Sequence, residues 1–126
     1  FAYILKSKDF LCEFSDKDFI VFMLTPENGT ETLEKLVDAL VSIPKKEEIS
    51  ENPPVIPVLS SAMSVRKAVF SPCETICTNQ AKGRILAQAN VACPPAVPVA
   101  VCGEVITEDA INCFEYYGIN QVKVVK

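Results

Sequence analysis

Residues 92–104, ACPPAVPVAVCGE, constrain the fold more than any other part of the sequence. Pro94, Pro95 and Pro98 fall close together there, and each proline removes a backbone donor that a central strand would need. The segment is also too apolar for a solvated linker. We therefore predict that this segment runs extended across a surface and not through the middle of a sheet. Residues 92–100 are here called the proline arm.

The bulk composition indicates a soluble globular protein. The chain has 126 residues and is 49% hydrophobic, enough for one domain or two very small ones with a core. Its net charge of −4 argues against a nucleic-acid partner. We find neither an apolar run of about 18 residues nor a signal peptide, so we expect a cytoplasmic protein without a membrane segment. The sequence opens on apolar residues and not on Met, so we expect a part of a longer protein.

The chemistry of this chain is limited by its lack of histidine. Without histidine there is no Ser-His or Cys-His nucleophile pair, and the commonest metal ligand is missing. No two cysteines are spaced C-x-x-C, so we predict no metal site. Free and mostly buried thiols are favoured over disulfides or a cysteine-only metal site. The six cysteines are Cys12, Cys73, Cys77, Cys93, Cys102 and Cys113.

The first part of the chain predicts a hairpin followed by a helix. Residues 1–5 could end a helix, and residues 10–14 and 19–24 read as strands joined by a polar turn, the second of them buried. Thr30 is a plausible N-cap for the next helix, and Pro44 would stop that helix. Its predicted inward stripe consists of Leu33, Leu36, Val37, Leu40 and Val41.

Residues 45–54 are charged and end in two prolines, which is typical of a linker, with 47–51 solvated. After an extended segment at 55–59, Ser64 would cap a short helix.

Residues 71–77 allow two interpretations, a helix opened by the capping box Ser71–Glu74 or a short strand over 74–77. Residues 79–88 resemble a helix. Thr107 would cap a helix over 108–117 with Ile111, Phe114 and Tyr117 facing inward, Gly118 would end it, and 122–125 would form a strand.

The predicted fold class is thus α+β, with small mixed or antiparallel sheet layers and packed helices in two small subdomains.

Three motifs in order suggest a family. They are Ala81-x-Gly83-Arg84-Ile85, the CPPAVP run at 93–98, and Gly103-Glu104. In this order the chain resembles the C-terminal region of the bacterial ornithine/lysine/arginine decarboxylases, which are pyridoxal-phosphate enzymes of the aspartate-aminotransferase fold. The resemblance covers nearly the whole chain and is strongest over 71–107.

The resemblance implies a domain plan and a function. Residues 1–44 would end the aminotransferase-type small domain, 45–54 would be the linker, and 55–126 the decarboxylase C-terminal domain. The parent enzyme would remove CO₂ from ornithine, lysine or arginine to give a polyamine precursor, and would be a homo-oligomer such as a dimer. Its cofactor lysine, in a Ser-x-His-Lys context, would lie in an upstream large domain that binds pyridoxal phosphate.

This chain alone would therefore bind no cofactor and catalyse nothing, and would give structural support. The alternative function is a stand-alone α+β binding or regulatory module without enzymatic activity. Cys93, Ala96 and Cys102 depart from the family's usual Tyr, Gly and Pro, which indicates a divergent member.

We predict no catalytic, cofactor-binding or metal-binding residue in this chain. The candidates for a substrate entrance or an interface are Glu104, Arg84, Cys93, Pro94 and Pro95. Each also has a plainer interpretation.

Glu104 either is solvated or accepts a cationic substrate group or an interface arginine. Arg84 makes either a structural ion pair or carbonyl contact, or a domain-interface contact. Cys93 is a small buried filler and not a reactive thiol, the prolines are conformational, and Lys82 is a solvated residue.

Overall fold

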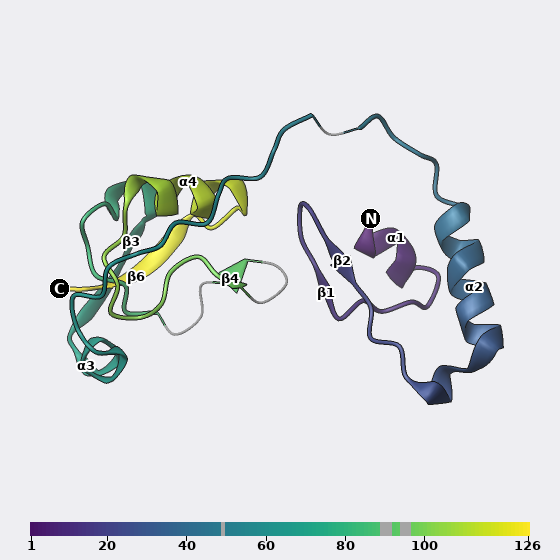
Figure 1. Ribbon diagram of the computed structural model, residues 1–126, viewed down its shortest axis with the longest axis horizontal. Coiled ribbons are helices and arrows are strands. Elements are labelled where there is room, and N and C mark those ends of the chain that lie inside the picture. The colour runs from purple at the N-terminus through teal and green to yellow at the C-terminus, as the bar shows by residue number, and fades with distance from the viewer. Residues whose placement is uncertain (49, 89–91, 94–96) are drawn as a thin grey trace. The chain divides into compact units, whose positions relative to one another are not determined.

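The computed structural model describes residues 1–48, 50–88, 92–93 and 97–126. The chain has the predicted α+β fold and divides into two compact units, Phe1–Glu51 and Asn52–Lys126, here called the N-terminal unit and the C-terminal unit (Figure 1). The division falls after Glu51, within the segment predicted as a linker. Among the described residues, no helix combines the length and the apolar character needed to cross a bilayer.

The N-terminal unit contains a short helix, a hairpin and a longer helix. Its elements are α1 (Ala2–Lys6), β1 (Phe14–Ser15), β2 (Ile20–Val21), η1 (Pro26–Asn28) and α2 (Gly29–Val41). The hairpin is antiparallel with Phe14 opposite Val21. Asp16 shapes its turn, because its Oδ1 accepts hydrogen bonds from the backbone N–H groups of Asp18 (2.9 Å) and Phe19 (2.7 Å). The predicted hairpin is present, but its paired strands are much shorter than the predicted ones.

The start of α2 differs from the prediction. Thr30 lies inside the first turn and is not the N-cap, because the chain already turns at η1. There the Asn28 side chain accepts a hydrogen bond from the Thr25 backbone N–H at 2.7 Å. The helix ends at Val41, before Pro44 as predicted.

Most large apolar side chains of the N-terminal unit are exposed. Among its described residues only Leu5 and Ala39 are buried. Residues 20–22, Leu36 and Leu40 are half-buried, but the predicted burial is wrong for the other members of 19–24 and of the α2 stripe. A two-stranded hairpin and a few turns of helix form too few layers to cover these faces. The exposed members are Phe19, Met23, Leu24, Leu33, Val37 and Val41.

The C-terminal unit is built on a pair of antiparallel strands. Its elements are α3 (Val65–Phe70), β3 (Cys73–Cys77), η2 (Thr78–Gln80), β4 (Ala92–Cys93), β5 (Val97–Pro98), α4 (Glu108–Tyr116) and β6 (Gln121–Val125). β3 pairs with β6 in the register Cys73 opposite Val125 (Figure 1). Three single bridges continue the layer beyond β6, namely Leu86 to Val124, Ile85 to Val105, and Ser61 to Glu104.

The predicted helix over 79–88 is wrong. Only the 3-10 turn η2 forms, and Gly83 then adopts a φ of 76° that breaks the helix. Beyond it, the Leu86 N–H donates to the Glu104 carbonyl at 2.9 Å and the Ala87 N–H to the Lys123 carbonyl at 2.8 Å. The segment therefore runs extended between two neighbours. The strand interpretation of the preceding residues is confirmed by β3.

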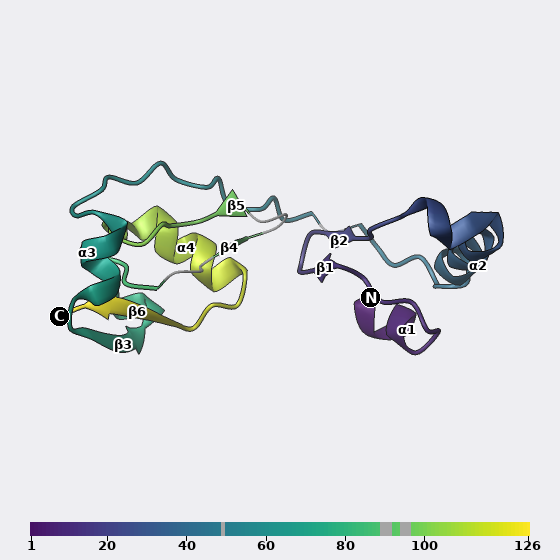
Figure 2. The ribbon, with the colours of Figure 1, turned by 90° about the horizontal axis from the view of Figure 1, so that it is seen from below.

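Helix α4 covers the core of the C-terminal unit (Figure 2). Thr107 caps it as predicted, since its Oγ1 accepts from the Ala110 N–H at 3.3 Å, and Ser64 caps α3 in the same way through the Lys67 N–H at 3.3 Å. Gly118 ends α4 with a φ of 73°. The largest fully buried side chains are Phe114, Leu86, Ile106, Val99, Val122 and Val124.

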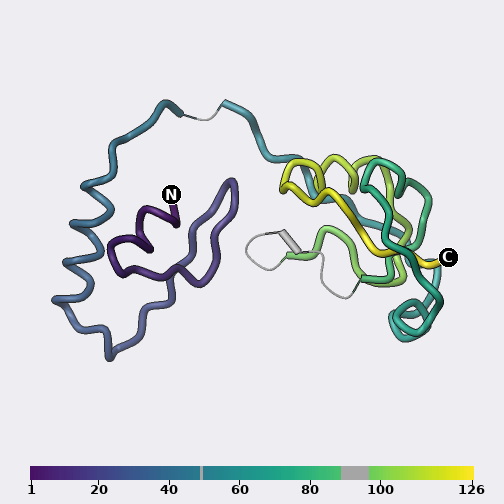
Figure 3. The backbone as a smooth tube through the Cα atoms, turned by 180° about the vertical axis from the view of Figure 1, so that it is seen from behind, coloured from purple at the N-terminus to yellow at the C-terminus, as the bar shows by residue number. Residues whose placement is uncertain are grey.

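The extended segment at 55–59 lies beside α4 (Figure 3). The Cys113 thiol on α4 is 3.6 Å from the Val55 carbonyl oxygen, to which it donates. Ile56 and Leu59 pack against the core, while Val58 faces solvent. The segment 55–59 thus covers part of the core of the C-terminal unit.

Candidate functional site

Glu104 closes a tight turn at the end of the proline arm. Its backbone N–H donates to the Val101 carbonyl at 3.0 Å, and its side-chain Oε2 accepts from the Val101 N–H at 2.7 Å. Both backbone polar groups of Val101 are therefore satisfied by one residue. The half-buried Glu104 carboxylate has a definite structural partner and is not a freely solvated group.

Gly103 makes this turn possible. Its φ is 97°, and a Cβ placed on it would lie 2.3 Å from the Met63 carbonyl oxygen. The Gly103 N–H donates to the Leu86 carbonyl at 2.8 Å, and its own carbonyl accepts from the Ala62 N–H at 2.9 Å. A side chain at this position would collide with the backbone of Met63 and crowd that of Ser64, so the Gly-Glu pair is explained by close backbone approach. The sequence reasoning missed this contact, because Met63 gives no local signal.

Arg84 ties the ends of the strand pair together. Its Nη2 donates to Glu74 Oε1 on β3 at 2.6 Å and to the Val125 carbonyl on β6 at 2.8 Å. The hydrogen bond from Arg84 is the main reason that the pKa of Glu74 is lowered. Arg84 thus makes both contacts that its structural interpretation predicts. A contact between Arg84 and another domain stays a prediction.

The structure places the backbones of Arg84 and Glu104 near each other without joining their side chains. The bridge between Ile85 and Val105 brings the two segments together. Arg84 is engaged with Glu74, whereas Glu104 is engaged with Val101. These two candidates therefore have separate partners and do not form one charged cluster.

The flanks of the proline arm form a small ribbon. Ala92 lies opposite Pro98 and Cys93 opposite Val97, in an antiparallel pair of two residues each. The described residues of the arm thus pair only in a two-stranded ribbon and not in the middle of a larger sheet, where each proline would remove a needed donor. Pro94 and Pro95 lie outside the described residues, and Cys93 is described only through its backbone. Beyond the ribbon, Val99 and Ala100 are buried, whereas Val97 and Pro98 are exposed.

The cysteines give no sign of a reactive site. Burial raises the pKa of the Cys102 thiol, which makes the thiolate less available. Of the cysteines whose side chains are described, Cys102 and Cys113 are buried, Cys12 and Cys73 are half-buried and Cys77 is exposed, and these carry no disulfide. The predicted burial is therefore right for two of these five thiols. In the described part of the chain, no cluster of acidic or cysteine side chains has the geometry of a metal site.

The lysines of this chain do not fit pyridoxal phosphate. A lysine that bonds to the cofactor is typically desolvated and has a lowered pKa. Lys82 instead pairs with Glu108 at 2.7 Å, and this hydrogen bond raises its pKa. Every lysine of the chain is exposed. The lysines of this chain therefore lack the desolvation that is typical of a cofactor lysine.

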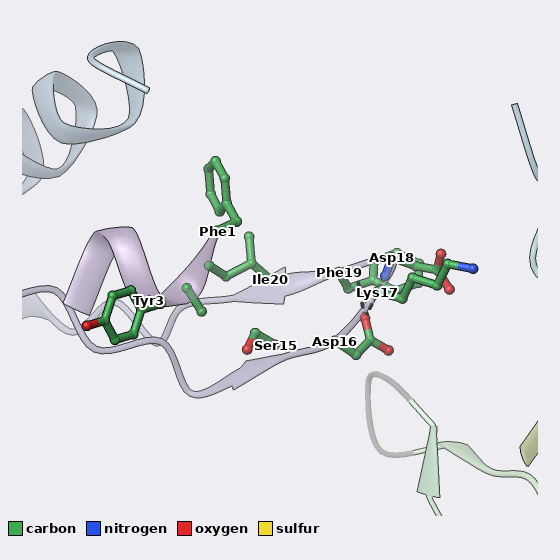
Figure 4. Close-up of a pocket in the computed structure, with 9 residues that line it drawn as sticks. Phe1, Tyr3, Ser15, Asp16, Lys17, Asp18, Phe19 and Ile20 are labelled. Carbon is green, nitrogen blue, oxygen red and sulfur yellow. Dashed lines mark hydrogen bonds between the residues drawn. The ribbon is translucent and has the colours of Figure 1, made fainter. Parts of the chain in front are cut away.

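The N-terminal unit holds a cavity of about 350 Å³ between α1 and the hairpin. Figure 4 shows Phe1 and Tyr3 on its helical side and Asp16 at the hairpin turn. Asp16 Oδ2 is buried and has no hydrogen-bond partner among the described residues, while its Oδ1 holds the turn. The sequence reasoning treated these residues only as a polar turn. The same lining also contains Ser15, Lys17 and Asp18, so the charged side chains of this cavity all come from the hairpin.

Comparison with known proteins places the chain in a family. Residues 45–123 match the Orn/Lys/Arg decarboxylase, C-terminal domain. An arginine decarboxylase of Bacillus subtilis (strain 168) is 34% identical over 110 residues, and one of Bacillus anthracis is 36% identical over 108. Each alignment covers 79% of this chain and 22% of the relative, so the chain spans about a fifth of these relatives.

No solved structure matches the chain. The matched residues include the three motifs that carried the resemblance, which is thereby confirmed. The chain belongs to the ornithine/lysine/arginine decarboxylase C-terminal domain family.

Proposed function

We propose that this chain is the non-catalytic C-terminal part of a pyridoxal-phosphate-dependent decarboxylase, with arginine as its first candidate substrate. The observation that carries the proposal is the family match over 45–123, together with the similarity to two proteins named arginine decarboxylase. Loss of CO₂ from arginine, lysine or ornithine would give a polyamine precursor. The enzyme would be cytoplasmic.

The non-catalytic role is supported by the side chains present. The chain has no histidine, and its candidate lysine Lys82 is exposed and paired with Glu108. The carboxylates of Glu74 and Glu104 have partners that belong to the fold itself. The cofactor and the reacting groups would therefore belong to an upstream large domain.

The supporting role rests on exposed apolar surface. Leu33, Val37 and Val41 on α2 and Val97 beside the proline arm are large apolar residues left uncovered within their own units. Burying such surface against another part of an enzyme is favourable by about 25 cal/mol per Å². We propose that these faces contact the large domain or a partner subunit in a homo-oligomer such as a dimer.

The proposed domain plan assigns 1–44 to the end of the small domain, 45–54 to the linker and 55–126 to the C-terminal domain. Interface or substrate-entrance roles of Arg84, Cys93, Pro94 and Pro95 stay predictions within this plan.

The decisive test is an assay of CO₂ release by the full-length gene product with arginine, lysine and ornithine. We expect arginine to give the highest kcat/KM. A full-length product that binds pyridoxal phosphate but decarboxylates none of the three would contradict the proposal.

A second test uses the 126-residue chain alone. Titrated with pyridoxal phosphate, it should show no saturable one-to-one binding by absorbance or calorimetry. Stoichiometric binding that depends on a single lysine would show that the cofactor site lies in this chain after all.

A further inference from the structure

We infer that Glu104 is a positioning residue: its carboxylate holds the Val101 backbone N–H and thereby fixes the backbone at the C-terminal end of the proline arm. The alternative, binding of a cationic substrate group by Glu104, predicts a different response to substitution. The inference concerns the fold of this chain, so only its kinetic readout rests on the proposed function.

Glu104 itself is anchored by its backbone. Its carbonyl accepts from the Leu86 N–H at 2.9 Å, and a bridge joins it to Ser61. The preceding Gly103 is held between Leu86 and Ala62 by hydrogen bonds of 2.8 and 2.9 Å. The Glu104 backbone is therefore held by a neighbouring segment on each side.

Val101 is an exposed residue that follows the arm and lies between buried neighbours. Val99 and Ala100 before it are 1% and 3% exposed, whereas Val101 is 42% exposed. Without an acceptor from the protein, the Val101 backbone N–H at this exposed position would bond only to water. The backbone conformation of Val101 would then not be fixed by this group. Glu104 Oε2 accepts a hydrogen bond from that N–H at 2.7 Å. The same turn is closed by the bond from the Glu104 N–H to the Val101 carbonyl at 3.0 Å.

The two possible roles of Glu104 differ in whether they need its negative charge. Holding a backbone N–H needs an acceptor oxygen at the right distance, which glutamine also supplies. Binding an ammonium or guanidinium group needs the negative charge. Glu104→Gln therefore separates the two roles, and Glu104→Ala removes both.

The test is hydrogen exchange of the full-length gene product, read at the Val101 amide with single-residue resolution. Loss of a hydrogen bond to a charged acceptor should speed exchange in Glu104→Ala about tenfold or more. Glu104→Gln should stay within about threefold of wild type. The matched control is Glu108→Ala, which removes a nearby surface carboxylate paired with Lys82 and should leave Val101 unchanged.

Kinetics supply the second readout. If Glu104 only positions the arm, Glu104→Gln keeps the KM for arginine, whereas a substrate-binding carboxylate would raise KM in Glu104→Gln as much as in Glu104→Ala. Unchanged exchange at Val101 in Glu104→Ala overturns the inference, as does equal loss of protection in both variants. If Glu104→Ala fails to fold, the exchange rate of the Val101 amide in Glu104→Gln decides between the two roles. A rate close to that of wild type supports the positioning role, and a large increase overturns it. A full-length product inactive on all three amino acids would refute the proposed function, while the exchange result would still judge the role of Glu104.

Discussion

Phe114 on α4 and Leu33 on α2 both belong to the apolar stripe of an amphipathic helix, yet Phe114 is fully buried and Leu33 is 37% exposed. In the C-terminal unit, α4 packs on a layer that β3, β6 and the bridged segments build together. Among the described residues of the N-terminal unit, α2 is accompanied by the short helix α1, the turn η1 and a hairpin of two-residue strands. The same sequence pattern thus leads to burial in one unit and to exposure in the other.

The different burial of α4 and α2 shows what the periodicity of apolar residues predicts and what it does not. An apolar stripe identifies the face of a helix that gains from burial, but the covering surface comes from other segments. The C-terminal unit supplies that surface from its own chain, and the N-terminal unit does not. We expect the C-terminal unit to fold independently and the N-terminal unit to depend on contacts with other parts of its protein.

Separating the two units should have the largest effect. A fragment of residues 52–126 should unfold cooperatively with a free energy of about 3–5 kcal/mol, since a core of this size supports little more. A fragment of residues 1–51 should show no cooperative transition by circular dichroism or urea titration. A cooperative transition in the shorter fragment would remove the contrast between the units.

Truncating one helix residue in each unit should sharpen the contrast. Phe114→Ala leaves a cavity in the core that costs about 3–5 kcal/mol, which is nearly the whole expected stability of the C-terminal unit, so its cooperative transition should be nearly lost. Leu33→Ala, the matched change on α2, should lower the free energy of unfolding by less than about 1 kcal/mol. Both are measured by urea titration of the 126-residue chain. Similar losses for the two variants would show that α2 packs far better than its exposure indicates.

Two glycines of the C-terminal unit should respond unequally to alanine. Gly103→Ala should cost more than about 2 kcal/mol, because its Cβ would lie 2.3 Å from the Met63 carbonyl oxygen at a φ of 97°. Gly83→Ala should cost only about 1–2 kcal/mol, since its φ is 76° but no atom lies within 4 Å of the added Cβ. Equal costs in thermal unfolding would mean that backbone conformation alone matters at both sites.

The parts of this fold that the sequence predicts correctly are those fixed by nearby residues. The caps by Thr107 and Ser64 each depend on a partner three positions away, and β6 has a compact apolar pattern. The error at 79–88 has the opposite origin. Those residues favour a helix locally, but the N–H groups of Leu86 and Ala87 bond to residues that lie far along the chain. Tertiary hydrogen bonds override local propensity there.

The candidate site shows the same limit. The motifs identify Arg84 and Glu104 as residues of interest, but they do not reveal the partners that define what these residues do. Arg84 donates to the carbonyl of Val125, 41 positions away. Glu104 bonds to Val101, only three positions away, yet its place in the fold depends on Leu86 and Ser61. The roles of Arg84 and Glu104 can therefore be assigned only once the segments that surround them are placed in the fold.

The smallest expected effect is a pH dependence carried by one ion pair of the C-terminal unit. The Arg84 hydrogen bond, followed by the charges of Arg84 and Lys126, lowers the pKa of Glu74 below its ordinary value of 4.5. A carboxyl group with a lowered folded-state pKa binds fewer protons in the folded than in the unfolded chain. Its stabilising effect is therefore complete above the ordinary pKa and is lost as the pH falls through the folded-state value.

Glu74→Gln should accordingly lower the urea midpoint slightly at pH 7, and the gap to wild type should close as the pH falls below about 4.5. The effect is small because the pair is partly exposed, with 34% of the Arg84 and 41% of the Glu74 side chain accessible. Glu115→Gln, on the exposed side of α4, is the matched control and should show no such closing gap. A gap for Glu74→Gln that stays constant with pH would mean that the side-chain hydrogen bond from Arg84, and not the charge of Glu74, links β3 to β6.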